Sequence, residues 1–291
     1  MQLVFHAGAH FTEEDRLIKC LLRNQDALAG KGVVVPGPSK YRKLLRKTLS
    51  VPNDAVFAAD ARDVLLDAIL DNAGADRVIL SNAHLFGVPR AAQRRGMLYP
   101  QAPERMARLA QIFRTDQLEL FMAVRDPATF LPACFRKSPH DTLADFMRGI
   151  DPRQVRWSDT FARIREAAPE VPVTVWCNED APLLWSQIVR ELGVMEHGDF
   201  VIGGFDLLSD IISDEGMRRF VDYIKSKSKM SEIQVRRVMM AFMEKFALEQ
   251  AIEEEIDVPG WTGDMITELS ELYDEDMATL ARIPGVTLIS P

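Results

Sequence analysis

Short apolar runs alternate with amphipathic segments along the first two thirds of the chain. Five runs have the length and residue types of buried strands, at residues 2–6, 33–35, 78–80, 118–124 and 173–177. Segments whose apolar residues recur at helical spacing lie among them, at residues 13–28, 61–70, 104–113 and 158–167. Strands buried on both faces and joined by helices are typical of a parallel sheet. The pattern therefore predicts a three-layer α/β sandwich with a mainly parallel sheet.

The pattern changes after Gly203 and Gly204, where helical segments predominate. We expect helices at residues 215–224, 231–252 and 265–280, followed by a single strand at 286–289. The segment 231–252 places apolar residues on broadly one face, Met239 and Met243 among them, as a helix that packs on a core requires. Residues 1–291 are expected to form one α/β domain whose C-terminal part, from about residue 205, is mostly helical.

Composition and charge limit the class of protein. Of the 291 residues, 47% are hydrophobic and 27% are charged, which is ordinary for a globular chain. No stretch has the roughly 18 uncharged apolar residues of a membrane span, and the apolar start is too short for a signal peptide, so a cytoplasmic location is expected. Residues 1–150 carry 21 Lys/Arg against 16 Asp/Glu, whereas residues 151–291 carry 14 against 27. The acidic second half argues against nucleic acid as a partner.

The turn after the first predicted strand is where α/β proteins bind phosphate-like groups, because backbone N–H groups and a helix dipole converge there. Here the turn consists of Gly8, Ala9, His10, Phe11, Thr12, Glu13, Glu14 and Asp15. It matches neither the Walker A loop nor the G-x-G-x-x-G of dinucleotide-binding proteins. Thr12 and Asp15 approximate a capping box, and the three carboxylates suit a helix N-terminus, so a purely structural turn is one interpretation.

Three parts of the chain resemble bacterial sulfotransferase-like proteins. Residues 5–12, with 22–24 and 32–38, are similar to that family's strand, H-x-G-x-H-K-T-G-T-T loop, helix and following Gly-Val strand. Residues 123–135 are similar to its strand, R-[ND]-P and helix element, and residues 273–276 and 284–286 resemble its C-terminal end. The resemblance implies a P-loop NTPase-like fold of the sulfotransferase type.

The resemblance also implies a ligand site. In that family the first loop holds the 5′-phosphosulfate of 3′-phosphoadenosine-5′-phosphosulfate, and an arginine, with a serine eight residues later, holds the 3′-phosphate. By position, Gly8 and Thr12 match the loop and Arg125 matches the arginine. The ligand-binding residues predicted in this way are Gly8, Ala9, His10, Thr12, Arg125 and Ser138.

The loop departs from the family's pattern at the positions that matter most for an anion. Phe11 replaces the lysine, Glu13 replaces a glycine, and Glu14 and Asp15 replace two threonines, while Ala133 stands at the serine position. Losing the lysine removes a charge-assisted hydrogen bond of about 1.5–3 kcal/mol. A carboxylate about 4 Å from a phosphate repels it by roughly 4 kcal/mol at an effective dielectric near 20. We therefore expect a degenerate donor site.

Other residues could carry chemistry. His84 follows the predicted strand at 78–80 and is the candidate general base, or else a structural loop residue. Arg125 is either an anion clamp or a salt-bridge partner. His6 and His10 could hold a cation with the carboxylates, but they share no regular face, and no metal site is predicted. The basic run at 40–47 could face an acidic substrate, a membrane surface or the acidic half of the chain, or be a solvated helix face.

The leading hypothesis is a sulfotransferase-like protein whose donor site is degenerate, so that transfer is lost or altered and the pocket at residues 8–12 and Arg125 binds another ligand or is structural. One alternative is an active sulfotransferase that moves a sulfuryl group from 3′-phosphoadenosine-5′-phosphosulfate to a hydroxyl acceptor, with His84 as base. Another is a non-catalytic interaction protein that uses the basic run or the Met-rich helix. A small molecule is the expected partner, and the sequence leaves the oligomeric state open.

Overall fold

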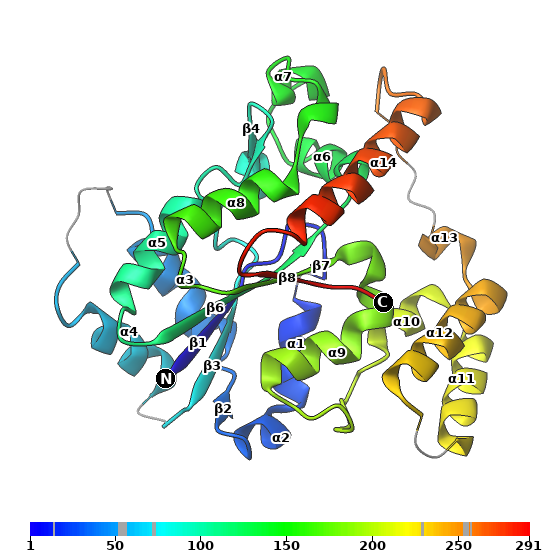
Figure 1. Cartoon of the computed structure of the whole chain (residues 1–291), viewed down its shortest axis with the longest axis horizontal. Helices are drawn as coiled ribbons and strands as arrows, with labels where there is room; N and C mark the ends of the chain where they lie inside the picture. The colour runs from blue at the N-terminus through cyan, green and yellow to red at the C-terminus, as the bar shows by residue number, and fades with distance from the viewer. Residues whose placement is uncertain (14, 52–56, 72–73, 228–229, 253–255, 257) are drawn as a thin grey trace.

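A six-stranded parallel sheet forms the centre of the computed structural model, which describes residues 1–291 except 14, 52–56, 72–73, 228–229, 253–255 and 257 (Figure 1). The strand order is β2-β3-β1-β6-β7-β8, and every neighbouring pair is parallel. The strands are β1 (Gln2–His6), β2 (Val33–Val34), β3 (Arg77–Ser81), β6 (Gln117–Val124), β7 (Val173–Cys177) and β8 (Val286–Ile289). The predicted mainly parallel sheet is thereby confirmed. A separate antiparallel hairpin joins β4 (Gln93–Arg94) to β5 (Met97–Leu98).

Helices cover both faces of the sheet. Successive residues of β1 point to opposite faces, so that Leu3 and Phe5 enter one hydrophobic core and Val4 enters the other. The first core is covered by α3 (Pro38–Thr48), α4 (Ala61–Leu70), α5 (Ala102–Ile112), α6 (Pro127–Phe135), α7 (Leu143–Met147), α8 (Trp157–Ala167) and α14 (Gly263–Leu280). The second is covered by α1 (Arg16–Arg23), α2 (Gln25–Ala29) and α9 (Ala181–Gly193). The three layers follow from strands that are apolar on both faces.

The helix after the first strand is shorter than its apolar spacing predicts. It begins at Arg16 rather than at residue 13, and it is interrupted at Asn24, which separates α1 from α2. The Asn24 side chain donates to the Cys20 carbonyl at 2.8 Å and thereby competes with the helical backbone pattern. The expected capping box is also wrong, because the Thr12 hydroxyl donates to the Ala9 carbonyl and Asp15 accepts no capping hydrogen bond.

The C-terminal part is mostly helical, as predicted, and comprises α10 (Asp206–Ile211), α11 (Asp214–Ser226), α12 (Glu232–Phe246), α13 (Glu249–Ile252) and α14. The single helix expected over residues 231–252 is divided at Ala247, whose backbone is extended. There the Phe246 carbonyl accepts from the Ser213 N–H, and the Leu248 N–H donates to the Ile211 carbonyl. These two hydrogen bonds to residues around α10 replace the hydrogen bonds that would continue α12.

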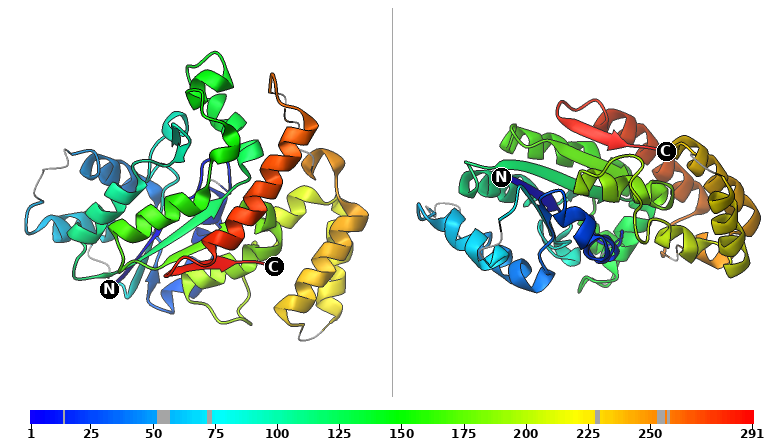
Figure 2. Two further views of the ribbon diagram at one scale, coloured as in Figure 1. Left: turned by 45° about the horizontal axis from the view of Figure 1, so that its top comes forward. Right: turned by 90° about the horizontal axis from the view of Figure 1, so that it is seen from below.

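The apolar stripe of α12 is only partly a core face. Met239 is buried with Leu208, Ile212 and Phe220 in a small hydrophobic cluster, whereas Ile233 is 62% exposed. Both views of Figure 2 show α11 and α12 side by side, at the opposite side of the molecule from the N-terminus. Among the described residues, no helix is both long and apolar enough to cross a membrane.

Candidate functional site

The loop between β1 and α1 lies at the carboxyl edge of the sheet, where open α/β sheets place ligands. Its first residues continue along β6, because the N–H groups of Ala7 and Ala9 donate to the carbonyls of Phe121 and Ala123 at 2.9 and 3.1 Å. Gly8 turns the chain with a φ of +48°, a conformation that glycine adopts without strain. The loop is therefore built into the sheet edge rather than projecting from it.

Glu13 folds beneath this loop instead of stabilising the helix N-terminus. Its Oε1 is 2.5 Å from His6 Nε2, and both side chains are 1% exposed. A Cβ on Gly8 would lie 3.4 Å from the same oxygen, so the carboxylate is packed against the loop backbone. The expected place of Glu13 at a helix N-terminus is thus wrong, while Glu14 lies outside the described residues.

His6 connects Glu13 to the neighbouring strand. The sheet register pairs His6 with Ser81 on β3, and His6 Nδ1 is 2.9 Å from Ser81 Oγ. The ring also stacks on Trp176 of β7, with 5.8 Å between centroids. The order serine, histidine and carboxylate is that of a hydrolase triad, but Ser81 is 1% exposed and no substrate reaches it. These groups fix the loop and supply no nucleophile.

His10 is held by a different set of residues, Tyr99 and His84. Its backbone N–H donates to the Tyr99 hydroxyl at 2.9 Å, and its Nδ1 is 2.7 Å from the same oxygen. His10 Nε2 is 3.0 Å from Nδ1 of His84, whose side chain is exposed. Burial lowers the pKa of His10 to about 4, so the ring is neutral at pH 7.

The two loop histidines do not converge on a common point. His6 contacts Ser81 and Glu13, whereas His10 contacts Tyr99 and His84. Across the part of the chain that the structure describes, no group of three or more His, Cys, Asp or Glu side chains could hold a metal ion. The described residues of this loop therefore supply no ligand set for the cation hypothesis.

Arg125 fastens the loop from the end of β6. Its guanidinium donates to the Phe11 carbonyl and, through Nε, to the Thr129 hydroxyl at 2.8 Å. Phe11 has a φ of +61°, which costs a residue with a side chain roughly 1–2 kcal/mol, and the hydrogen bond from Arg125 offsets part of that cost. The arginine that the resemblance assigns to an anion is thus in contact with the loop itself.

A cleft of about 720 Å³ opens beside the loop, at the carboxyl ends of β6 and β7. Its polar lining comprises Thr12, Glu13, Arg16, Arg125, Asp126, Thr129, Asn178, Glu179, Asp210 and Gln250. The opposite wall belongs to α10, α12 and α13, through Leu207, Ile211, Met243 and Ala251. The cleft lies between the first loop and the C-terminal helices, and both contribute to it.

The structure brings some of the predicted site residues to this cleft and not others. Thr12 and Arg125 line it, and Gly8, Ala9 and His10 form the loop behind it. Ser138 follows α6, which at nine residues is about 13 Å long and begins next to Arg125, and its hydroxyl accepts from the His140 N–H instead. The structure therefore does not bring Ser138 to the cleft. His84 also lies away from the lining, beside His10.

Two lining carboxyls that the sequence interpretation missed are coupled through the backbone. Glu179 Oε1 accepts from the Asp126 N–H at 3.0 Å, and Glu179 Oε2 accepts from the Tyr273 hydroxyl at 3.1 Å. Asp126 caps α6 through the Ala128 N–H and accepts from the Ser270 hydroxyl. Burial raises the pKa of both carboxyls. Their positions directly after β6 and β7 are the signal that could have identified them.

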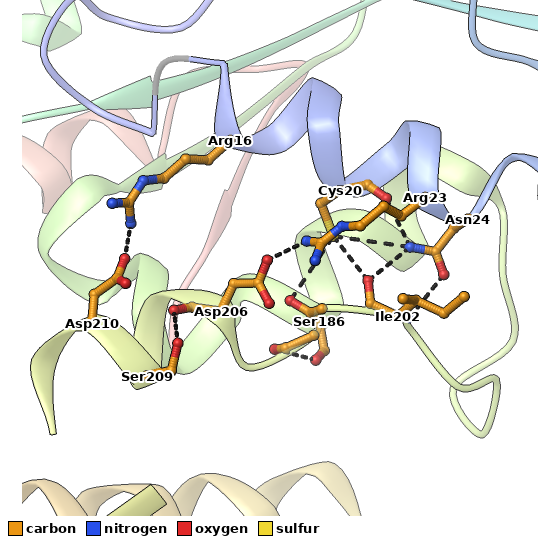
Figure 3. A network of polar contacts seen from close by, with 11 residues as sticks. Arg16, Cys20, Arg23, Asn24, Ser186, Ile202, Asp206, Ser209 and Asp210 are labelled. Atoms are coloured by element: carbon orange, nitrogen blue, oxygen red, sulfur yellow. Dashed lines mark hydrogen bonds and ion pairs between the residues drawn. The ribbon is translucent and has the colours of Figure 1, made fainter. Parts of the chain in front are cut away.

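The α10 wall of the cleft is docked onto α1 by a polar network (Figure 3). Arg16 pairs with Asp210, and Arg23 pairs with Asp206, both at the surface. Asn24, 2% exposed, donates to the Ile202 carbonyl at 2.9 Å and accepts from the Ile202 N–H at 2.8 Å. This buried amide bridge holds the segment that leads into α10.

The basic run lies in α3, and some of its charged side chains pair with other residues of the chain. Arg42 pairs with Asp15 at 2.6 Å and donates to the Ser81 carbonyl at 3.0 Å, and Lys40 pairs with Asp71. These contacts tie α3 to the acidic run and to the end of β3.

Charge at the cleft is unbalanced. Four carboxyls line it against the two guanidiniums of Arg16 and Arg125, and Arg16 already pairs with Asp210.

Searches among protein-family models, curated proteins and solved structures find no match to this chain. The function is therefore inferred from the geometry of the loop and the cleft. This geometry favours a neutral or cationic ligand over an anionic one.

Proposed function

We propose that the chain is a sulfotransferase-like protein, with the P-loop-like fold of that family, whose first loop no longer binds 3′-phosphoadenosine-5′-phosphosulfate. The cleft beside the loop binds a small neutral or cationic ligand instead. The observation that carries this proposal is the position of Glu13, whose buried carboxylate lies against Gly8 and His6 on the loop that would hold the donor.

Three of the donors at such a loop are engaged elsewhere. The N–H groups of Ala9 and His10 donate to the Ala123 carbonyl and the Tyr99 hydroxyl, and Arg125 donates to the Phe11 carbonyl. A phosphate within about 4 Å of the Glu13 carboxylate would be repelled by roughly 4 kcal/mol at an effective dielectric near 20. Binding the nucleotide requires the loop to release these contacts and Glu13 to leave its site.

The remaining cleft suits hydroxyl or amine groups. Asp126 and Glu179 offer acceptors at the ends of β6 and β7, and Thr129 and Asn178 add polar groups beside them. A phosphate or sulfate placed here would face four described carboxyls and two guanidiniums that already have partners. The ligand class follows from this charge balance rather than from the resemblance.

Isothermal titration calorimetry with adenosine 3′,5′-bisphosphate tests the proposal. We expect heats no larger than those of dilution at millimolar nucleotide. The matched variant carries Phe11→Lys and Glu13→Gly, which restore the family's residues, and it is expected to bind the nucleotide measurably.

Micromolar binding by the wild-type chain would instead favour the active sulfotransferase. In that case, His84→Ala should abolish transfer to a hydroxyl acceptor without changing nucleotide affinity, because His84 is exposed and contacts only the edge of the loop through His10.

A further inference from the structure

A second cavity, of about 310 Å³, lies between α9, the segment 197–205, α11 and α12. It shares no lining residue with the cleft at the first loop. Its interior is apolar and is formed mainly by Leu183, Phe205, Ile224, Met230, Val235 and Met239. The volume is within the range of small-molecule sites in proteins.

The mouth of this cavity carries uncompensated positive charge. Arg190 and Arg236 both face Glu232, the first in direct contact and the second at 3.7 Å. Because one carboxylate faces two guanidiniums, these three groups carry a net charge of +1. The other acid in the lining, Asp199, pairs with Lys31 at 3.1 Å and also lies near Arg190, so the three basic and two acidic groups together carry one net positive charge.

One of these guanidiniums also has an unused donor. Among the described residues, Arg190 Nε has no hydrogen-bond partner, although the atom is buried. Arg236 reaches the Gln187 side-chain oxygen, which holds its guanidinium at the cavity. A buried donor without an acceptor costs about 1–3 kcal/mol, and because this nitrogen has no exposed surface, a ligand in the cavity meets the other guanidinium nitrogens of the two arginines.

We propose that this cavity binds a small amphipathic monoanion, such as a medium-chain carboxylate. The apolar tail lies against Ile224, Val235 and Met239, and the carboxylate lies at Arg190 and Arg236. Phe200 also lines the cavity and is 79% exposed. The net positive charge selects the head group, and the apolar lining selects the tail. This site is independent of the function proposed for the first loop.

Octanoate is the probe, and the readout is NMR of the full chain with ¹³C-labelled methionine methyl groups. We expect octanoate to shift the signals of Met230 and Met239, which line the cavity, and to leave Met106 and Met122 of the other core unchanged. Octanol, with a similar tail and no charge, should bind about tenfold more weakly.

The variants separate the head-group contact from the apolar lining. Arg236→Gln should weaken octanoate about tenfold. Arg237→Gln, the adjacent and exposed position on α12, should bind like the wild type. Val235→Trp should fill the cavity and abolish binding, and thermal unfolding establishes that each variant is folded. Unshifted Met230 and Met239 signals, equal affinities for octanol and octanoate, or wild-type affinity in Arg236→Gln would overturn the proposal.

Discussion

The two described carboxylates of the acidic run after β1 have different environments. Glu13 is buried against His6, whereas Asp15 pairs at the surface with Arg42. Only the exposed Asp15 can interact favourably with the N-terminus of α1. The Glu13 carboxylate is directed beneath the loop and does not face the N–H groups of that helix. Acids two positions apart in the same run therefore make unequal contributions to the fold.

Alanine substitutions at these two positions should measure the difference. Glu13→Ala leaves His6 buried without its partner and is expected to lower the free energy of unfolding by about 3 kcal/mol. Asp15→Ala breaks an exposed ion pair and should cost less than about 1 kcal/mol. Urea denaturation monitored by circular dichroism gives both values. Equal losses in the two variants would show that Glu13 is not packed as described.

His10 should make stability depend on pH. Its pKa is about 4 in the fold against 6.5 in the unfolded chain, so below pH 6.5 the unfolded state binds the extra proton. Stability is therefore lost as the pH falls from 6.5 towards 4, by about 2 kcal/mol at pH 5.

The variant His10→Asn removes this contribution and keeps a polar atom near Tyr99. The loss of unfolding free energy between pH 7 and pH 5 should be about 2 kcal/mol smaller in this variant than in the wild type. His197→Asn, at a 90% exposed ring, is the control and should keep the wild-type pH profile. A wild-type profile in His10→Asn would contradict the buried, neutral state of the ring.

At the scale of elements, one amide side chain does more than the surface ion pairs to dock α10 onto α1. Asn24 satisfies both backbone groups of Ile202 in a buried position, whereas the Arg23 and Asp206 side chains are about half exposed. Gly203, with a φ of +78°, completes the junction, because a Cβ there would clash with the Arg23 guanidinium. The wall of the cleft depends on this junction.

Substitutions at neighbouring positions of this junction should separate the two contributions. Asn24→Ala leaves the N–H of Ile202 unpaired and its carbonyl with only the weak Cys20 thiol donor, and should destabilise the chain by about 2 kcal/mol. Arg23→Ala should cost less than about 1 kcal/mol. Hydrogen exchange of residues 202–211 is expected to accelerate strongly in the first variant only. Comparable exchange rates in both variants would contradict the central role of Asn24.

Regular elements could be predicted from local pattern, but their interruptions could not. The bounds of β1, β7, β8 and α4 agree with the apolar spacing, because strands and helices that face a core repeat their apolar positions. The breaks at Asn24 and Ala247 depend instead on Ile202 and Ile211, which are far away in sequence. The apolar spacing of the sequence continues through both breaks, so it does not reveal these tertiary partners.

In the whole molecule, the sheet edge that holds the site could be predicted from the sequence, but the burial of Glu13 at that site could not. Parallel strands joined by helices place Thr12 and Arg125 at one edge, and both line the cleft. The burial of Glu13 requires His6 and Ser81, which meet only through the register of β1 and β3. The sequence shows that a carboxylate stands where the sulfotransferase-like proteins that this loop resembles have a glycine, but only the fold shows where that carboxylate goes.

The proposed function requires that the chain's own groups close the first loop. A crystal structure of the wild-type chain grown with millimolar adenosine 3′,5′-bisphosphate tests it most directly. We predict that Glu13 stays against His6, that Arg125 stays on the Phe11 carbonyl, and that residues 8–15 hold no nucleotide. A nucleotide or sulfate bound to that loop, with Phe11 and Glu13 displaced, would contradict the claim.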